Sequence, residues 1–489
     1  MTETTADDDA ELRALGYSAQ FDRNMSLWEN FALGFTYLSP VVGVYSLFAT
    51  AIASGGPPMI WWYGIAAIGQ MIVCLTFCEV VSQFPIAGGL YPWCRRLVGK
   101  KWAWMAGWVY GWALFTSIAG VSAGAAPFVA QLFGFEATPV NSGLISIALV
   151  AISTLTNLAG TKTLARVAMF GFICEILGAL VVGAILLLFH RHQPVSVILD
   201  PHGVSHGGPY FPAFMSAAIV GLFTCYGFEA CGDVAEETPN PGVAIPKAMK
   251  STIYIGMSAS IFVCLALILS LPDIGAVIDG RSTTPIQDAL MAAFGPIGTK
   301  AVIVVVLVSF LSCVLSLQAA ASRLAYAYAR DDMVVASTWL RKVSTTHHVP
   351  TNALALSGVI AAAILVLGMF FANAVATIVS FAVVGIYAGF QMVVMAALFA
   401  RAKGWRPHGK FRLGGWGWPI NIVGLVWGVS AIADMLQPGG GDLPWYESWG
   451  MVMTFVAVVV SGLVYMVIGR PYDRSDSPAG DAWRPRSAG

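Results

Sequence analysis

The residues of this sequence best suited to chemistry are the few carboxylic acids that lie inside long apolar stretches. Four acids do so: Glu79, Glu175, Glu229 and Asp434. A charged group is costly to keep in apolar surroundings, so such acids are candidates for binding or proton transfer unless they lie near a hydrated end. We expect Glu79 and Asp434 near such ends, and Glu175 and Glu229 deeper. For Glu175, a neutral acid hydrogen-bonded to a neighbouring helix is the alternative to a functional role.

The positions of the histidines and cysteines in the sequence do not indicate an enzyme site. All seven histidines fall at the ends of the apolar stretches or between them: His190, His192, His202, His206, His347, His348 and His408. This removes the usual metal ligands and bases of an intramembrane enzyme, and no nucleophile motif stands beside a suitable base. The eight cysteines show neither metal-ligand nor disulfide spacing. We expect a protein that is not an enzyme and that uses no cofactor or metal.

Two apolar stretches contain helix-breaking residues near their middle. The first contains Pro40 and Gly43, and the second contains Gly227, two positions before Glu229. Backbone inside a bilayer must satisfy its own hydrogen bonds, so paired interruptions mark a binding site. A tolerated proline kink or a close helix contact would explain either stretch alone. We predict two interruptions of regular helix, at residues 39–44 and 225–228.

The residues around these interruptions form our candidate binding site. Backbone can approach a ligand most closely at Gly43 and Gly227, which have no side chain. Aromatic rings beside them could surround an organic cation, a contact worth about 2 kcal/mol or more once desolvated. Ring packing is the commoner role in a chain with 12% aromatic residues. The predicted substrate-binding residues are Ser39, Gly43, Tyr45, Trp112, Phe223, Tyr226, Gly227 and Glu229.

The composition indicates a membrane protein. Hydrophobic residues make up 57% of the 489 residues and charged residues 11%, and the mean hydropathy is +0.74. Soluble domains average roughly 45–50% apolar and about 25% charged residues. The net charge is zero and the basic residues lie in short loops, so we expect membrane lipid as a partner and no nucleic acid.

Spanning a hydrocarbon core takes about 20 mostly apolar residues, and the sequence offers twelve such segments. They are 27–52, 59–83, 102–133, 141–158, 163–189, 211–234, 248–270, 301–326, 351–371, 373–400, 416–436 and 449–468. The interrupted segments are the first and the sixth, and this spacing favours a five-plus-five inverted repeat. We expect an all-α polytopic membrane protein with a tail at 1–24, a ten-span core at 25–400, two more spans at 401–470 and a tail at 471–489.

The basic residues orient the chain. Of the 26 Lys and Arg residues, Arg191, Arg281 and Lys300 fall in one set of alternate loops, and the other 23 lie in the tails and the remaining loops. Loops on the cytoplasmic side carry the excess of Lys and Arg. We therefore expect a multi-pass protein of the cytoplasmic membrane with both termini in the cytoplasm.

Three segments resemble signatures of the amino acid-polyamine-organocation superfamily of permeases. Residues 227–249 resemble the end of helix six and the following loop, residues 85–91 the signature after helix two, and residues 322–332 the cytoplasmic end of helix eight. The segments occur in order, and the spans cover about the whole chain. The resemblance implies a LeuT-like inverted-repeat fold with helices one and six broken around a central substrate site. The branch that carries amino acids, gamma-aminobutyrate (GABA) and choline is the most similar.

The resemblance also implies roles for particular residues. Glu229 aligns with an acid that handles substrate or protons in some members, and Ser312 and Cys313 lie near the cation ligands of sodium-coupled relatives. One hydroxyl and one thiol make a poor sodium cage, and interhelical hydrogen bonding is the alternative for both. Glu175 stands where several proton-driven relatives have a lysine, so their lysine mechanism does not carry over. We expect a proton rather than sodium as the driving ion.

One departure from the family bears on the substrate. Members that carry alpha-amino acids usually read glycine, small residue, glycine in the first break, whereas this chain reads Gly43-Val44-Tyr45. The resemblance implies a secondary active transporter that imports an amino acid, GABA, choline or a polyamine by alternating access. An exchanger of the same fold is the nearest alternative. A channel or sensor is a further one, but a channel would show a repeated filter loop or a charged pore ring.

Overall fold

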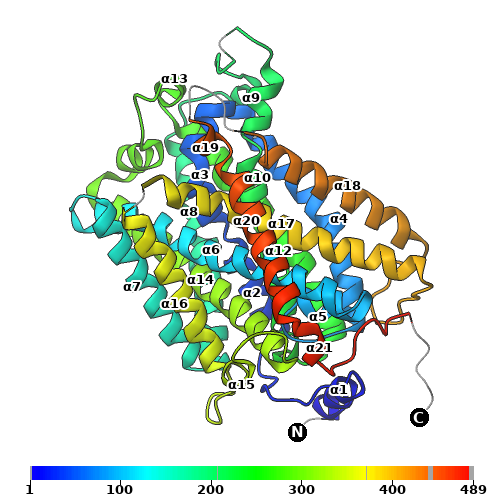
Figure 1. Ribbon diagram of the computed structural model, residues 1–489. Helices are drawn as coiled ribbons and strands as arrows, with labels where there is room; N and C mark the ends of the chain where they lie inside the picture. The colour runs from blue at the N-terminus through cyan, green and yellow to red at the C-terminus, as the bar shows by residue number, and fades with distance from the viewer. Residues whose placement is uncertain (1–2, 206, 371, 439–443, 484–489) are drawn as a thin grey trace.

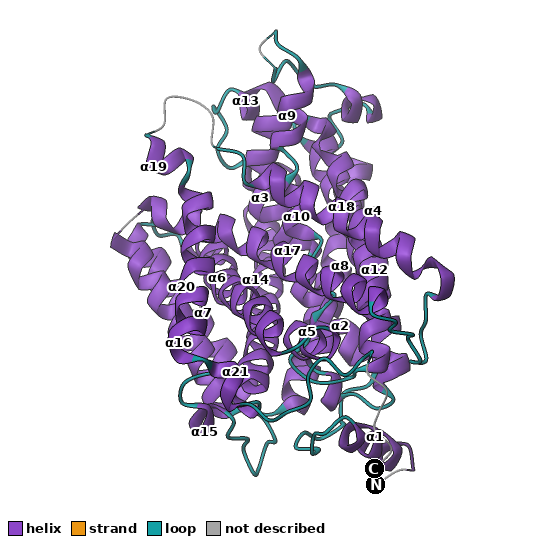
Figure 2. Cartoon of the chain, turned by 45° about the vertical axis from the view of Figure 1, so that its right-hand side comes forward, coloured by secondary structure: helices purple, strands orange, loops and turns teal. Residues whose placement is uncertain are grey.

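The computed structural model describes residues 3–205, 207–370, 372–438 and 444–483. These residues form a bundle of helices joined by loops, with no strand among them (Figure 2). The helix α1 (Glu3–Ala14) and the helix α21 (Pro471–Arg474) lie at the same end of the bundle (Figure 1). We call this end the tail side.

Eleven helical segments of the described chain are long and apolar enough to cross a membrane. They are α2 with α3 (Leu27–Gly55), η1 with α4 (Pro57–Gln83), α6 (Lys100–Phe133), α7 (Pro139–Leu158), α8 (Thr161–Phe189), α12 (Pro241–Ser270), α14 (Pro285–Arg330), α16 (Thr351–Phe370), the Ser380–Ala402 part of α17 (Ala372–Ala402), η4 with α18 (Gly414–Met435) and α20 (Gly450–Gly469). The helix α14 contains a kink at Gly295, where φ is 63°. The predicted polytopic, all-helical fold is confirmed.

The predicted span 211–234 consists of three short helices instead of one long helix. These are α9 (Tyr210–Ser216), α10 (Ile219–Thr224) and α11 (Ala230–Asp233). The count of twelve spans therefore depends on joining these pieces into one crossing. The predicted tail 471–489 and the predicted span 351–371 extend in part outside the described residues.

The remaining short helices lie between the spans. They are α5 (Leu90–Leu97), η2 (Val195–Leu199), η3 (Ala235–Glu237), α13 (Ile274–Ile278), α15 (Ser337–Leu340) and α19 (Trp445–Ser448). The helix α6 lies inside the bundle and packs against α7, α14 and α17, and α4 packs against α12 and α18. Around the predicted interruptions, α3 packs against α12 and α14, and α10 packs against α3 and α4.

Buried ion pairs tie the tail side of α14 to the segment that follows α11. Arg323 donates two hydrogen bonds to Glu237, at 2.8 and 3.0 Å, and both side chains are fully buried. Arg330 pairs with Glu236 at 2.8 Å, and Ala87 N donates to the same Glu236 oxygen at 3.0 Å. The Arg323–Glu237 pair is two-pronged, and a pair of this kind fixes geometry as well as charge. The two ion pairs join α14, η3 and the loop before α5.

The C-terminal tail packs on α5. Arg95 donates to Ser475 Oγ at 2.7 Å, and Gly480 N donates to Arg95 O at 2.8 Å. Arg96 forms an ion pair with Asp481 at 2.8 Å. The two basic residues of α5 thus bind the C-terminal tail. From the sequence alone, they served only to indicate the orientation of the chain in the membrane.

The N-terminal tail reaches the same helix. Arg96 donates to Leu15 O at 2.8 Å, and the Tyr17 hydroxyl donates to Asp331 Oδ2 at 3.4 Å. Burial raises the pKa of the Tyr17 phenol, and the neighbouring Asp331 carboxylate raises this pKa further. The phenol therefore stays neutral and keeps the proton that it donates. Both tails therefore pack on α5, and the N-terminal tail also contacts the end of α14 through Asp331.

We expect Arg323→Met to destabilise the protein, because the change leaves the Glu237 carboxylate buried without its partner. Removing one member of a buried ion pair costs about 3–5 kcal/mol. The melting temperature of the detergent-purified protein measures this loss. The matched control is Arg341→Met, since the Arg341–Asp332 pair is exposed, and such pairs contribute about 0–1 kcal/mol. Equal melting temperatures of the two variants would contradict a structural role of the buried pair.

Candidate functional site

The first break lies at Ser39, between α2 (Leu27–Leu38) and α3 (Pro40–Gly55). Ser39 has φ 42° and ψ 92°, a conformation that few residues other than glycine adopt. Pro40 occupies the first position of α3, where a missing N–H does no harm. The Ser39 hydroxyl accepts a hydrogen bond from Val42 N at 3.2 Å. The local sequence thus ends one helix and starts the next within a single residue.

The carboxylate of Glu175 caps α3 from a different helix. Its Oε1 atom accepts hydrogen bonds from the Ser39 hydroxyl and from Val41 N, both at 2.8 Å. The start of a helix carries partial positive charge and unpaired N–H groups, so an anion is stabilised there. Glu175 is fully buried, and its Oε2 atom has no hydrogen-bond partner in the described structure. The predicted coupling residue Glu175 is therefore in direct contact with the predicted break.

The second break lies between α10, which ends at Thr224, and α11, which begins at Ala230. Gly227 has φ 103°, and a Cβ atom there would lie 2.7 Å from Leu38 N, so the position requires glycine. Gly227 N donates to Glu229 Oε2 at 2.8 Å. The carboxylate of Glu229 thus binds backbone that the break has left without a helical partner.

A tyrosine of α6 joins Glu229 to a second buried acid. The Tyr110 hydroxyl lies 3.2 Å from Glu229 Oε1 and 3.5 Å from Asp233 Oδ2. A phenol has one proton, so it donates to one carboxylate at a time. Asp233 Oδ1 is buried without a hydrogen-bond partner. Asp233 and Tyr110 were not predicted, although the four-residue spacing from Glu229 places Asp233 on the same face of a helix.

The two breaks face each other. The Tyr37 ring meets the Tyr226 ring edge to face, with centroids 5.8 Å apart, and Phe223 meets Tyr226 in the same way. Gly43 lies against Thr224, because a Cβ atom at position 43 would be 2.4 Å from Thr224 Oγ1. Of the predicted binding residues, the structure brings together Ser39, Gly43, Phe223, Tyr226, Gly227 and Glu229 at these breaks.

Comparison with known proteins identifies the family. The family model described as amino acid permease matches residues 25–460. The chain belongs to the amino acid permease family. This membership confirms the predicted relation to the amino acid-polyamine-organocation superfamily and makes the protein a multi-pass membrane transporter for amino acids.

Individual relatives of the permease have similar length. The amino-acid permease BAT1 homologue of Oryza sativa subsp. japonica is 26% identical over 94% of this chain and 92% of its own. The amino-acid permease BAT1 of Arabidopsis thaliana is 24% identical over the same shares. A putative amino acid/polyamine transporter of Macrophomina phaseolina is 26% identical over 79% of this chain and 89% of its own.

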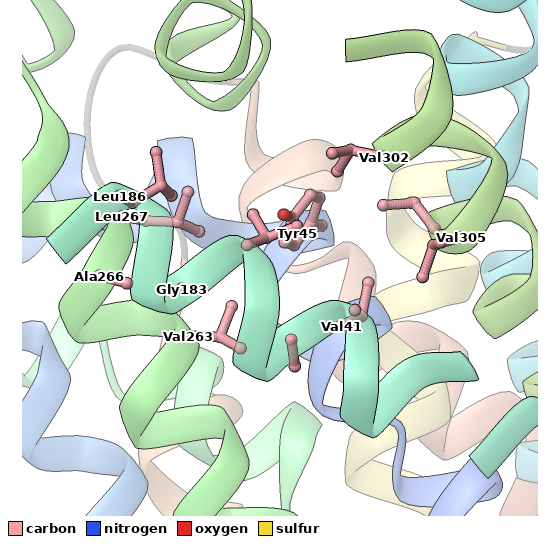
Figure 3. A pocket seen from close by; sticks show the side chains of 13 residues that line it. Val41, Tyr45, Gly183, Leu186, Val263, Ala266, Leu267, Val302 and Val305 are labelled. Atoms are coloured by element: carbon pink, nitrogen blue, oxygen red, sulfur yellow. The ribbon is translucent and has the colours of Figure 1, made fainter. Parts of the chain in front are cut away.

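Two predicted aromatic residues of the permease lie away from the acids at the breaks. Tyr45 packs against Phe128 and lines a cavity of about 20 Å³, room for about one water, among aliphatic side chains of α8, α12 and α14 (Figure 3). Trp112 packs against Trp108 and Phe115. Trp112 follows Tyr110 by two residues, or about 200° around the helix, so it faces away from Glu229. The structure does not assemble an aromatic cage that includes Trp112.

The predicted ion ligands of α14 contact both the first break and α8. Cys313 Sγ donates to Tyr37 O at 3.2 Å, in the last turn of α2. Ser312 lies against α8, because a Cβ atom at Gly171 would be 2.0 Å from Ser312 Oγ. Gly171 precedes Glu175 by one helical turn. The two residues therefore border the acid from α8, as interhelical contacts of small polar groups do.

The other two predicted acids, Glu79 and Asp434, have partners away from the breaks. Glu79 forms an ion pair with Arg401 and accepts a hydrogen bond from Leu413 N at 2.8 Å. Asp434 accepts a weak hydrogen bond from Gln437 Nε2 at 3.4 Å. Neither acid contacts the breaks.

We expect Gly43→Ala to weaken transport by the permease, because α3 and α10 would have to separate to admit the methyl group. Overpacking costs about 1–3 kcal/mol of stability, so the two helices move apart at the break and we expect uptake to fall roughly tenfold. Uptake into proteoliposomes measures the effect. Thr224→Ala removes the nearest atoms and should restore part of the uptake in the double variant. Gly64→Ala is the control, since nothing lies within 4 Å of that position, and equal uptake by Gly43→Ala and Gly64→Ala would refute the close contact.

Proposed function

We propose that the permease imports an amino acid or a related small amine by proton-coupled symport with alternating access, and that Glu229 carries the proton. One observation supports this most directly. Glu229 is fully buried at the second break, where it shares the Tyr110 hydroxyl with a second buried acid, Asp233. A proton on Glu229 can reach Asp233 through Tyr110, because the phenol accepts one proton as it gives up another. Asp233 lies one helical turn further along α11.

The first break supports recognition of the substrate mainly by its amine. A substrate carboxylate would bind at the start of α3, where N–H groups are free in an uncapped helix. In the permease these donors, the Ser39 hydroxyl and Val41 N, already bind Glu175. A carboxylate that used the same donors would have to displace Glu175. An ammonium group needs no such displacement, since it pairs with acids and with carbonyl groups at the C-terminal end of a helix such as α2.

We further propose that the tail side faces the cytoplasm. The tail side carries α1 and α5, and α5 holds Arg95 and Arg96. The predicted excess of Lys and Arg falls on the tails and on the loops of this side, which is the bias of cytoplasmic segments. A substrate that enters from the opposite side would then leave past the ion pairs of α14 and η3.

The central experiment measures uptake of radiolabelled amino acids, GABA, choline and polyamines into proteoliposomes with imposed pH or sodium gradients. We expect an inward proton gradient to drive accumulation of one amine class above equilibrium, with no requirement for sodium. Sodium-driven uptake that ignores the pH gradient would overturn proton coupling. Exchange against internal substrate without any net accumulation would identify an exchanger of the same fold instead.

We expect Glu229→Gln to abolish gradient-driven accumulation and to leave substrate exchange in place. Glutamine preserves the shape and the acceptor atom for Gly227 N, but it carries no exchangeable carboxyl proton. Asp434→Asn is the matched control, because it neutralises an acid within a span that does not contact the breaks. Wild-type accumulation by Glu229→Gln would show that Glu229 is only a packed, neutral acid.

We expect Tyr110→Phe to slow accumulation while the substrate still binds. The change removes the hydroxyl shared by Glu229 and Asp233, and a hydrogen bond to a charged group contributes about 1.5–3 kcal/mol, or roughly tenfold or more in rate. Tyr45→Phe serves as the control, since Tyr45 lies in an aliphatic cavity away from both acids. The initial rate of proton-driven uptake, compared with the rate of exchange, is the measurement. Equal slowing of both processes would point to a purely structural role of Tyr110.

A further inference from the structure

A basic pocket lies outside the transport site, where the link between α17 and α18 folds back on the end of α4. Its volume is about 480 Å³. The side chains that matter for its chemistry are Glu79, Arg401, Trp405, Arg406, Arg412 and Trp418. The pocket is on the tail side of the bundle, and neither break contributes to it.

Three polar side chains at the end of α4 hold the link in place. Glu79 accepts a hydrogen bond from Leu413 N at 2.8 Å, and Ser82 accepts one from Phe411 N at 2.7 Å. Gln83 accepts hydrogen bonds from the Trp405 ring and from His408 N. The end of α4 thus binds donors along residues 405–413 of the link: three backbone N–H groups and one tryptophan ring N–H. The pocket is therefore formed before any ligand arrives.

The charges of the pocket favour an anion. Glu79 is neutralised by its ion pair with Arg401, whose guanidinium also lies over the Trp405 ring at 5.3 Å. The Arg401 side chain is 6% exposed, and its Nε atom has no hydrogen-bond partner in the described structure. Arg406 and Arg412 are exposed, and neither makes a hydrogen bond or an ion pair with another described residue. Two unpaired guanidinium groups beside a buried N–H suit phosphate oxygens, which arginine binds in two-pronged fashion.

The surroundings of the pocket point to a lipid as the source of the phosphate. Trp416 and Trp418, at the tail-side start of α18, are 71% and 46% exposed, and exposed tryptophans of this kind lie at headgroup level. Further along α18, Ile422 and Val426 are also exposed, as expected of a lipid-facing helix. A phospholipid can place its headgroup in the pocket and its acyl chains along this face. Basic pockets between membrane helices bind anionic headgroups in this way.

We propose that this pocket binds the phosphate headgroup of an anionic phospholipid, with Arg406 and Arg412 as its ligands. This inference does not depend on the proposed transport mechanism. Because the link is bound to α4, α17 and α18 at once, an occupied pocket holds these three helices together. Binding should therefore stabilise the folded permease against heat.

The test titrates the detergent-purified, full-length permease with dioctanoyl phosphatidylglycerol and, separately, with dioctanoyl phosphatidylcholine. We expect phosphatidylglycerol to raise the melting temperature and to remain bound in native mass spectra, and phosphatidylcholine to do neither. Arg406→Gln/Arg412→Gln should weaken phosphatidylglycerol binding by roughly tenfold or more, since charge-assisted hydrogen bonds are lost. The control Arg341→Gln/Lys342→Gln removes two basic residues of another tail-side loop and should bind as the wild type does.

Three outcomes would overturn the proposal. The first is equal binding of the two lipids, and the second is wild-type binding of phosphatidylglycerol by Arg406→Gln/Arg412→Gln. The third is an equal rise in melting temperature with inorganic phosphate alone, which would identify a site for a free anion. If the double variant fails to fold, Arg412→Gln alone replaces it, because this exposed side chain makes no hydrogen bond or ion pair with the described residues.

Discussion

The need to satisfy every backbone hydrogen bond in an apolar medium governs this structure. Inside lipid, an unpaired N–H or C=O group costs several kcal/mol, so a spanning helix can be broken only where other groups replace the lost bonds. At the first break, Glu175 of α8 replaces them by accepting from Ser39 and Val41. The break in one helix thus requires a carboxyl group on another, and the acid fixes how α8 and α3 pack.

The second break meets the same requirement in a different way. Glu229 lies within the break itself and accepts from Gly227 N, while Tyr110 of α6 supplies the second donor. Each break therefore holds a carboxyl group that belongs to the protein. A carboxyl group that accepts these hydrogen bonds can also gain or lose a proton. The stability of the broken segment is therefore linked to the protonation of its acid. In the proposed function, the same acid serves both structure and proton coupling.

Local sequence accounts for the spans and for the positions of the breaks, because proline, glycine and apolar runs act on the nearest residues. Local sequence did not predict the contacts between helices that are far apart in the chain. Trp112 was predicted to belong to an aromatic cage at the breaks, but its phase on α6 turns it away, whereas Tyr110 on the same helix reaches Glu229. The end of α4 shows the same limit: Glu79 was expected near a hydrated end, and nothing in its neighbourhood indicated that it would bind a link more than 300 residues away.

The segment that follows the second break connects the site to the tail side. Within nine residues, Glu229 binds the break, Asp233 shares Tyr110, and Glu236 and Glu237 pair with Arg330 and Arg323 of α14. The helix α11 has only four residues, so it cannot move without shifting both sets of contacts. In the proposed cycle, opening toward the tail side has to disturb the buried ion pairs. In the same proposal, charge changes at Glu229 and Asp233 act on this short segment, so protonation acts directly on the ion pairs that close the tail side.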